Sequence, residues 1–229
     1  MRAPKIFALV VLLAGGAVVA AAQGPDPAVI KDSIGASMMR VRKFQWIQTM
    51  TLAVDGETKQ TSVSSCRYAP ESPKPACTEI SSTPAEKPSG GPFRKRKMEA
   101  AISEMKAYMD SVKTLIGEYV PPRQEKIAAA MQVGNVATAP NPSMGSVSLI
   151  VSNYTQQGDK LTFVVGAKDS QLRSVSIATW LNDPAAVVTL NVTYAALNDG
   201  THYAQRTVLN ASAKKIMIIV TTTNYSVAM

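Results

Sequence analysis

The chain has 229 residues, of which 46% are hydrophobic and 17% charged, and its formal net charge is +8 at neutral pH. This length suits one domain with a sizeable core. The modest positive charge fits either simple solubility or contact with anionic lipid, polysaccharide or acidic proteins. Two cysteines and one histidine argue against a zinc site.

The first 22 residues have the pattern of an export signal. Arg2 and Lys5 give a positive start, an apolar run follows over 6–20, and small alanines then supply a cleavage site. The run is shorter than a good membrane span and no stop-transfer charges follow it. We therefore predict a signal peptide at 1–22 and a single mature domain at 23–229, soluble in the periplasm or secreted. Export argues against a nucleic-acid partner.

A short helix and a hairpin are expected to open the mature domain. Apolar residues recur at three- and four-residue steps over 27–42, which predicts an amphipathic helix. Two β-favouring runs follow, at 44–54 and 58–68. They are separated by Asp55-Gly56, a strong signal for a two-residue hairpin turn.

The segment 69–93 is rich in proline, serine, glycine and lysine, and we expect a flexible surface loop there. Cys66 precedes this loop and Cys77 lies within it. In an oxidising compartment such a close pair tends to form a disulfide, and two free thiols are the alternative. The spacing is not the Cys-x-x-Cys of redox proteins.

Two helices are expected next. One apolar stripe steps by four and three residues, which predicts a helix of about 25 residues that faces a sheet. Pro121-Pro122 should end this helix and open a second one at 123–132, which Gly134-Asn135 would end. The stripe consists of Met98, Ile102, Met105, Met109, Val112, Ile116 and Tyr119.

From residue 146 onward only β-strand signals remain. Six runs rich in Val, Ile, Thr and aromatics are separated by short turn sequences, which indicates antiparallel neighbours. Alternation of apolar and polar residues predicts one buried sheet face. The resulting fold class is α+β, with a curved antiparallel sheet of about 7–8 strands covered by two or three helices. The runs are 147–154, 160–168, 172–181, 187–197, 202–209 and 215–225.

This order of elements, behind an export signal, resembles the half-barrel of the periplasmic carriers that move lipoproteins to the outer membrane. The stretches at 43–52 and 222–225 also resemble a group of exported bacterial proteins of unassigned function. The resemblance implies a carrier of lipid-like ligands. The carrier family holds its lid with an arginine, and no arginine of this chain is matched to that role.

A catalytic constellation is not found in the sequence. His202 could serve as a general base, but it follows an Asp199-Gly200 turn without a nucleophile motif, and an exposed residue at the start of a strand is the favoured interpretation. No nucleophile elbow, phosphate loop or zinc-protease motif occurs. We therefore expect a protein that is not an enzyme and needs no cofactor.

Two groups of residues are candidates for binding. Met98, Met105, Met109 and Met131 could surround an apolar ligand, because methionine adapts to varied shapes, or they could simply fill a core. The run Arg94, Lys95, Arg96 and Lys97 opposes the dipole at the start of the long helix. It could attract an anionic membrane surface or acidic partner, or be a solvated loop end.

The sequence therefore favours an exported binding protein for a lipid, lipopeptide or other apolar ligand. The alternative is a structural or interaction module with a filled core that contacts an envelope partner through its basic residues. The oligomeric state is left open.

Overall fold

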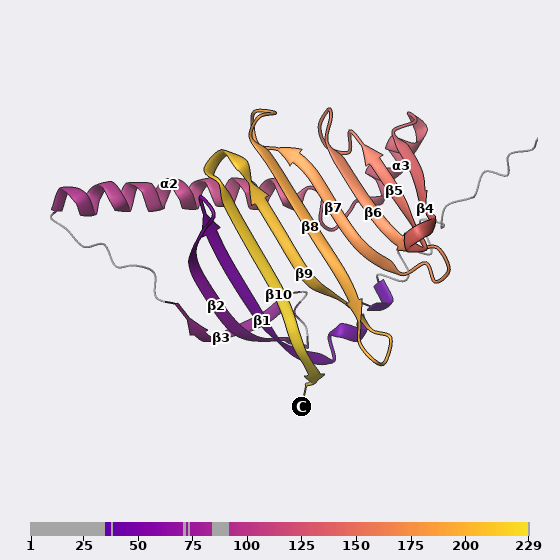
Figure 1. Ribbon diagram of the computed structural model, residues 1–229, viewed down its shortest axis with the longest axis horizontal. Coiled ribbons are helices and arrows are strands. Elements are labelled where there is room, and N and C mark those ends of the chain that lie inside the picture. The colour runs from indigo at the N-terminus through magenta and orange to yellow at the C-terminus, as the bar shows by residue number, and fades with distance from the viewer. Residues whose placement is uncertain (1–34, 38, 71, 73, 84–91, 229) are drawn as a thin grey trace, which may run out of the picture.

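The computed structural model describes residues 35–37, 39–70, 72, 74–83 and 92–228. The predicted signal peptide at 1–22 lies outside these residues, as does most of the helix predicted at 27–42. Of the described residues of that helix, 35–37 and 39–41 are helical and Arg42 lies in a turn. The rest of the described chain is an α+β structure built on one large antiparallel sheet (Figure 1).

The sheet has ten strands in the order β3-β2-β1-β10-β9-β8-β7-β6-β5-β4, and it does not close. Each neighbouring pair is antiparallel, which confirms the prediction made from the short connections between successive strands. The pairing of β1 with β10 was not predicted. The early hairpin β1–β2 pairs with the last strand β10, so the two ends of the described chain share one sheet. The strands are β1 Phe44–Val54, β2 Glu57–Tyr68, β3 Pro75–Ser82, β4 Val136–Asn141, β5 Ser146–Ser152, β6 Lys160–Gly166, β7 Leu172–Trp180, β8 Val187–Ala196, β9 His202–Ala211 and β10 Ile216–Val227.

The prediction of about 7–8 strands missed the two edge strands, β3 and β4. β3 lies inside the segment 69–93 that was predicted to be a flexible loop, and all eight of its residues are exposed. β4 is short and contains Pro140. Neither strand shows the alternation of apolar and polar residues that marks a half-buried strand. An edge strand does not need this alternation, since its backbone hydrogen bonds to the neighbouring strand can hold it in the sheet.

The predicted hairpin turn is confirmed. Asp55 and Gly56 have φ angles of 55° and 82°, so both central residues are left-handed, as a type I′ turn requires. Glycine adopts this conformation without steric cost, and aspartate tolerates it better than most residues.

Helix α2, Pro92–Gly117, is 26 residues long, and α3 is Gln124–Gln132. Both agree with the predicted helices. In Figure 1, α2 runs across the strands behind the sheet, and its first turns extend past β2. α3 lies at the other end of the sheet, beside β4 and β5.

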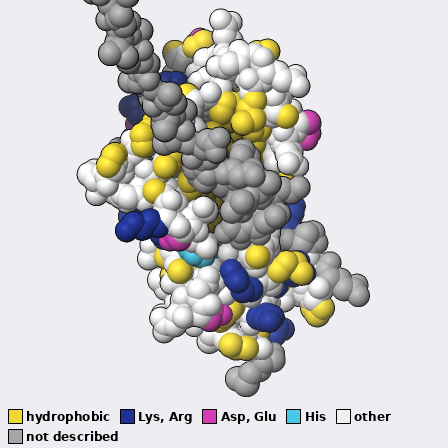
Figure 2. Space-filling model, turned by 90° about the vertical axis from the view of Figure 1, so that its right-hand side faces the viewer, with side chains coloured by type: hydrophobic (Ala, Val, Ile, Leu, Met, Phe, Trp, Pro, Cys, Tyr) yellow, Lys and Arg dark blue, Asp and Glu magenta, His cyan; other side chains and the backbone are white. Residues whose placement is uncertain are grey.

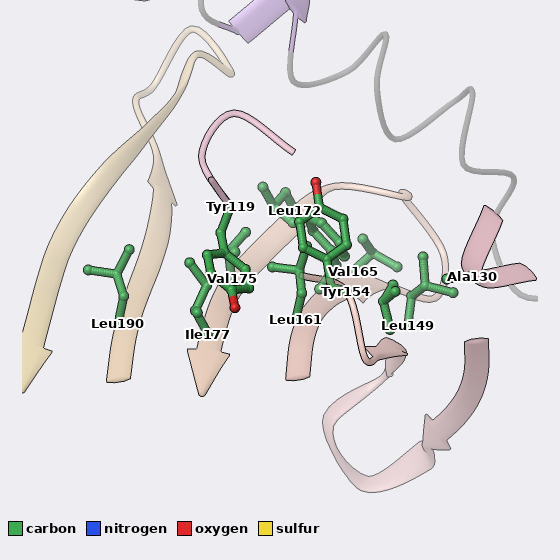
Figure 3. Packing of buried hydrophobic residues seen from close by; sticks show 12 residues of the cluster. Tyr119, Ala130, Leu149, Tyr154, Leu161, Val165, Leu172, Val175, Ile177 and Leu190 are labelled. Carbon is green, nitrogen blue, oxygen red and sulfur yellow. The ribbon is translucent and has the colours of Figure 1, made fainter. Parts of the chain in front are cut away.

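Two apolar clusters lie between the helices and the sheet. The first contains twelve buried residues, and Figure 3 shows members such as Leu161, Val175 and Ile177 with Tyr119 from the segment after α2. The second contains four buried residues, Val112, Val188, Ala211 and Ile216, surrounded by ten half-buried ones. The α3 side of the sheet therefore has a filled core, and the α2 side is more loosely covered.

The predicted disulfide is confirmed. Cys66 of β2 and Cys77 of β3 lie directly opposite each other and are bonded, with 4.1 Å between their Cα atoms. The bond ties an edge strand that buries no side chain of its own. This covalent link replaces the packing that the proline-rich segment cannot supply.

Candidate functional site

The methionine stripe of α2 reaches the sheet only in its middle part. Met105 and Met109 are half-buried and pack in the second cluster, around the fully buried Val112. Ile116 packs against both clusters. These residues follow the predicted spacing, so this part of the stripe faces the sheet as expected.

The first part of the predicted stripe does not face the core. Ile102 is 60% exposed, which corrects its assignment to the buried face. Met98 is half-buried and belongs to neither cluster. These turns of α2 lie toward the end that extends past β2 (Figure 1).

Met131 lies apart from the other methionines. It is near the end of α3 and is 48% exposed. The four candidate ligand-binding methionines are therefore not brought together: Met105 and Met109 share one cluster, whereas Met98 and Met131 do not belong to it. On the side of the molecule that carries α3 and β4, hydrophobic side chains reach the surface (Figure 2).

An apolar strip continues along the sheet below α2. Leu52 of β1 and Ile218 of β10 are opposite each other and belong to the second cluster. Met50 and Val220 are the next opposite pair on the same face, because alternate residues of a strand share a face. All four are half-buried. We call Met50, Leu52, Ile218 and Val220 the apolar strip.

Beyond the polar pair Gln48 and Thr222 on the same face lies a group of five aromatic rings that no sequence pattern indicated. Trp46 lies on the same face of β1 as Met50, and its ring stacks on Tyr225 with centroids 5.6 Å apart. Arg42 lies over the Tyr68 ring, 5.3 Å from its centroid. Burial raises the pKa of Tyr225 to about 12. The aromatic group is Phe44, Trp46, Tyr68, Tyr203 and Tyr225.

An open depression of about 440 Å³ lies beside the second half of α2. Its described lining includes Asp110, Ser111 and Thr114 of α2 and Leu181 after β7. The Ser111 and Thr114 hydroxyls donate to carbonyls of their own helix, so they are already engaged. The described lining contains no methionine of the stripe.

The four basic residues Arg94, Lys95, Arg96 and Lys97 lie in the first turns of α2, and all four are exposed. The first turn of this helix has no acidic residue. Positive charge at a helix start is unfavourable by some tenths of a kcal/mol per residue, so local helix stability does not explain the group. Figure 1 shows this end of α2 beyond the sheet.

A buried polar network fixes the other end of α2. The Tyr119 hydroxyl donates to Asp159 Oδ2 over 2.5 Å and lies 2.8 Å from Thr179 Oγ1. Both Tyr119 and Asp159 are fully buried. Burial, followed by the hydrogen bond to Asp159, raises the pKa of Tyr119. The segment after α2 is therefore tied to the β5–β6 loop and to β7.

Asp159 is the centre of this network. Its Oδ1 accepts the Tyr154 N–H, and its Oδ2 accepts the N–H groups of Thr155 and Gln156. Three backbone donors and the Tyr119 hydroxyl thus surround one carboxylate. The sequence predicts a turn between the runs 147–154 and 160–168, and an Asp in a turn before a strand is the available signal for this role.

His202 is the first residue of β9, as expected, but it is half-buried rather than exposed. Its Nδ1 is buried and has no hydrogen-bond partner among the described residues. Burial is the main cause that lowers its pKa below 6.5. Arg173 and Arg40 lower it further, and Asp169 opposes them.

This gives a pH-dependent prediction. Because the folded protein favours the neutral imidazole, the unfolded chain binds more protons below about pH 6.5, and stability should fall as the pH drops from about 7.5 to 5.5. Urea unfolding at several pH values measures how the free energy of unfolding changes over this range. The His202→Gln variant should lose the part of the pH dependence that comes from this residue. An unchanged profile in the variant would contradict the assignment.

Within the described residues, no group of three or more His, Cys, Asp or Glu side chains is placed to hold a metal ion. No helix in the same residues is long and apolar enough to cross a membrane. The arrangement thus offers an apolar sheet face, an aromatic group and a basic helix end. These features suit non-covalent binding.

Comparisons with known proteins give similarity in structure only. Neither protein-family models nor the sequences of curated proteins match this chain. A DUF1329 family protein from Desulfovibrio piger is similar over 90% of this chain and 94% of its own, with a TM-score of 0.39 and 6% identity. A LolA superfamily protein from Nitrosomonas europaea is similar over 85% and 93%, with a TM-score of 0.32 and 6% identity. We transfer no residue role from either.

Proposed function

We propose that this protein is an exported, non-catalytic binding protein that holds an apolar or amphipathic ligand in the cell envelope. The ligand class is a lipid, a lipopeptide or a hydrophobic protein segment. The proposed binding site is the apolar strip, between α2 and the aromatic group. The export signal and the disulfide support the periplasm or the exterior as its location.

The observation that carries the proposal is the apolar strip. Met50, Leu52, Ile218 and Val220 form consecutive opposite pairs on the face that α2 covers only at one end. All of them keep part of their surface exposed. Contiguous exposed apolar surface on a sheet is unfavourable in water and marks binding sites.

The neighbours of the apolar strip suit a varied ligand. Met105 and Met109 border it at the α2 end, and methionine side chains adapt their shape to different apolar partners. At the other end, beyond Gln48 and Thr222, aromatic rings offer large apolar surfaces with polar hydroxyls. We propose that Met105 and Met109 contact the ligand and that Met98 and Met131, which lie outside this cluster, do not.

Mass spectrometry of lipids retained after gentle purification, with titration of a hydrophobic fluorescent dye, tests the proposal. The Val220→Asp variant places a charge on the apolar strip and should abolish retention and weaken dye binding. Thr221→Asp is the matched control, because the next residue of β10 faces the other side of the sheet. If the parent protein retains no lipid and binds no dye, ligand binding on this face is wrong.

The basic residues Arg94, Lys95, Arg96 and Lys97 are proposed to hold the protein near an anionic membrane surface. All four are exposed at the end of α2 that extends past the sheet. Each basic residue close to such a surface is worth about 1 kcal/mol, and the attraction is screened by salt.

Replacing these four residues by glutamine should weaken binding to vesicles rich in anionic lipid by at least about tenfold at low salt. Folding and ligand retention should be unchanged. A control variant that replaces Lys106 and Lys113, also exposed on α2, should keep most of the binding. Sedimentation with anionic and neutral vesicles measures this, and equal binding to both would show that the basic residues are a solvated helix end.

The alternative function is an interaction module that carries no small ligand. The twelve-residue cluster under α3 favours it, because that part of the core is already filled. Exposed apolar residues beside it, such as Met131, Val133 and Met144, could contact a protein partner. Absence of retained lipid together with vesicle binding that depends on the basic residues would favour this function.

A further inference from the structure

The two ends of the apolar strip differ in charge. At the α2 end, the neighbouring lysines are paired with carboxylates: Lys215 with Asp55 over 2.8 Å, and Lys214 with Glu104. At the aromatic end, Arg42 has no carboxylate partner among the described residues. An unpaired cation at one end of an apolar surface favours one orientation of a ligand that has an apolar part and an anionic part.

Arg42 lies on the same face of the sheet as the apolar strip. Trp46 shares a face of β1 with Met50, and the centroid of its ring is 5.6 Å from that of Tyr68. The Arg42 guanidinium lies over the Tyr68 ring, 5.3 Å from the centroid. These contacts place the positive charge at the aromatic end of the face that carries the strip.

The Arg42 guanidinium keeps donors that a ligand can use. Its hydrogen bonds to described residues go to the carbonyls of Ala69, Pro70 and Ser72, and all of them use Nη2. Nε and Nη1 have no acceptor within the described part of the chain. Carbonyl groups also leave the positive charge without a counter-charge. Phosphate and carboxylate oxygens supply both the acceptors and the charge, and hydrogen bonds to them are stronger than neutral ones.

Between the apolar strip and this cation, the same face of the sheet becomes polar. Gln48 and Thr222 are opposite each other there. The Thr222 hydroxyl donates to the Ala204 carbonyl, whereas the half-buried Gln48 amide has no hydrogen-bond partner among the described residues. The face therefore changes from apolar to amide to aromatic with a cation, over roughly 20 Å of strand between Leu52 and Trp46. This order matches a chain-like ligand with a polar linkage and a charged head.

We infer that the ligand is an anionic amphiphile, whose apolar chain lies on the apolar strip and whose terminal phosphate or carboxylate binds Arg42. This orientation rests on the proposed function, which places an apolar ligand on the strip. Phospholipid-like and fatty-acid-like molecules share the required chemistry. The contribution of the charged head should be screened by salt, whereas the contacts of the chain should not be.

Probes with one common alkyl chain and different heads test this assignment by isothermal titration calorimetry below their micelle concentrations. Dodecyl phosphate and dodecanoate should bind about tenfold more tightly than uncharged dodecyl maltoside at low salt, and high salt should reduce the difference. Tighter binding of the phosphate would indicate a phospholipid-like ligand, and tighter binding of the carboxylate a fatty acid. Inorganic phosphate, which has no chain, should bind far more weakly, and equal binding would contradict the role of the strip.

Variants locate the charge. Arg42→Gln should weaken binding of the anionic probes about tenfold, to the level of the maltoside, and leave maltoside binding unchanged, which shows that the strip is intact. Arg42→Lys keeps the charge and should keep most of the preference, even if the contacts to Ala69, Pro70 and Ser72 are lost. Arg67→Gln is the matched control. Arg67 is exposed at the same edge of the sheet, but it is opposite Gln45 and so faces the other side.

The outcomes separate this assignment from the proposed function. Equal binding of anionic and uncharged probes by the parent protein would overturn the anionic head and leave the apolar site standing. A preference that survives Arg42→Gln but is lost in Arg67→Gln, or when Arg94, Lys95, Arg96 and Lys97 are replaced by glutamine, would overturn it as well, because the charge would act elsewhere. If the parent protein binds none of the alkyl probes, both the anionic head and the apolar site are wrong.

Discussion

Replacing Asp159 by alanine should lower the free energy of unfolding by about 3–4 kcal/mol. The variant would leave the buried Tyr119 hydroxyl and Tyr154 N–H without this acceptor. It would also remove the acceptor of the partly buried N–H groups of Thr155 and Gln156. Hydrogen bonds to a charged group are stronger than neutral ones, and unpaired buried donors are costly. Urea unfolding at neutral pH measures the loss.

Two further variants give this result its controls. Tyr119→Phe removes one of the four donors and keeps the other three, so it should cost about 1–2 kcal/mol. Asp110→Ala removes an exposed carboxylate from α2 and should change stability by less than about 0.5 kcal/mol. Equal losses for Asp159→Ala and Asp110→Ala would show that the network does not stabilise the fold.

A charge introduced in the middle of the interface between α2 and the sheet should also lower the stability strongly. Val112→Asp buries a carboxylate at a fully buried position without any partner, and we expect a loss of at least about 3 kcal/mol or no folded protein. Met109→Asp should cost less, because Met109 is half-buried and its charge can reach water. Thermal melting of the purified variants measures which substitution lowers the stability more.

Ile102→Asp is the control for that series. The residue belongs to the same predicted stripe but is 60% exposed, so the substitution should change stability by less than about 0.5 kcal/mol. A loss at Ile102 as large as the loss at Val112 would mean that the whole stripe is buried, which would contradict the arrangement of α2 on the sheet.

The sequence identified the elements whose own residues carry a periodic pattern. β6 was predicted because Leu161, Phe163 and Val165 recur at every second position of a β-favouring run, and these three are buried in the structure. The β1–β2 turn was predicted because Asp-Gly allows two left-handed residues in succession. In both cases the local physics alone determines the element.

The missed elements depend on contacts that no local pattern contains. β3 exists because its backbone pairs with β2 and because Cys77 is bonded to Cys66, although none of its side chains is buried. Ile102 was assigned to the buried face because its spacing fits the stripe, but a spacing does not say where the sheet ends.

The candidate site was found in part. Met105 and Met109 were predicted to face the sheet and do so. The apolar strip was missed because Met50 and Val220 are 170 residues apart in sequence and become neighbours only when β10 pairs with β1. The acceptor role of Asp159 was missed for the same reason, because Tyr119 meets it only in the folded chain.

The anchoring of α2 at one end has a consequence for amide hydrogen exchange. The C-terminal half of the helix is held by Val112 and, just beyond it, by the Tyr119 network, whereas the first turns carry exposed side chains and four like charges. Local opening free energies should therefore decrease from the C-terminal to the N-terminal turns. Amides near Val112 should exchange only with global unfolding, and those that follow Lys97 should exchange through fraying of the helix. Within one continuous helix, the chain would then contain both its slowest and some of its fastest exchanging amides.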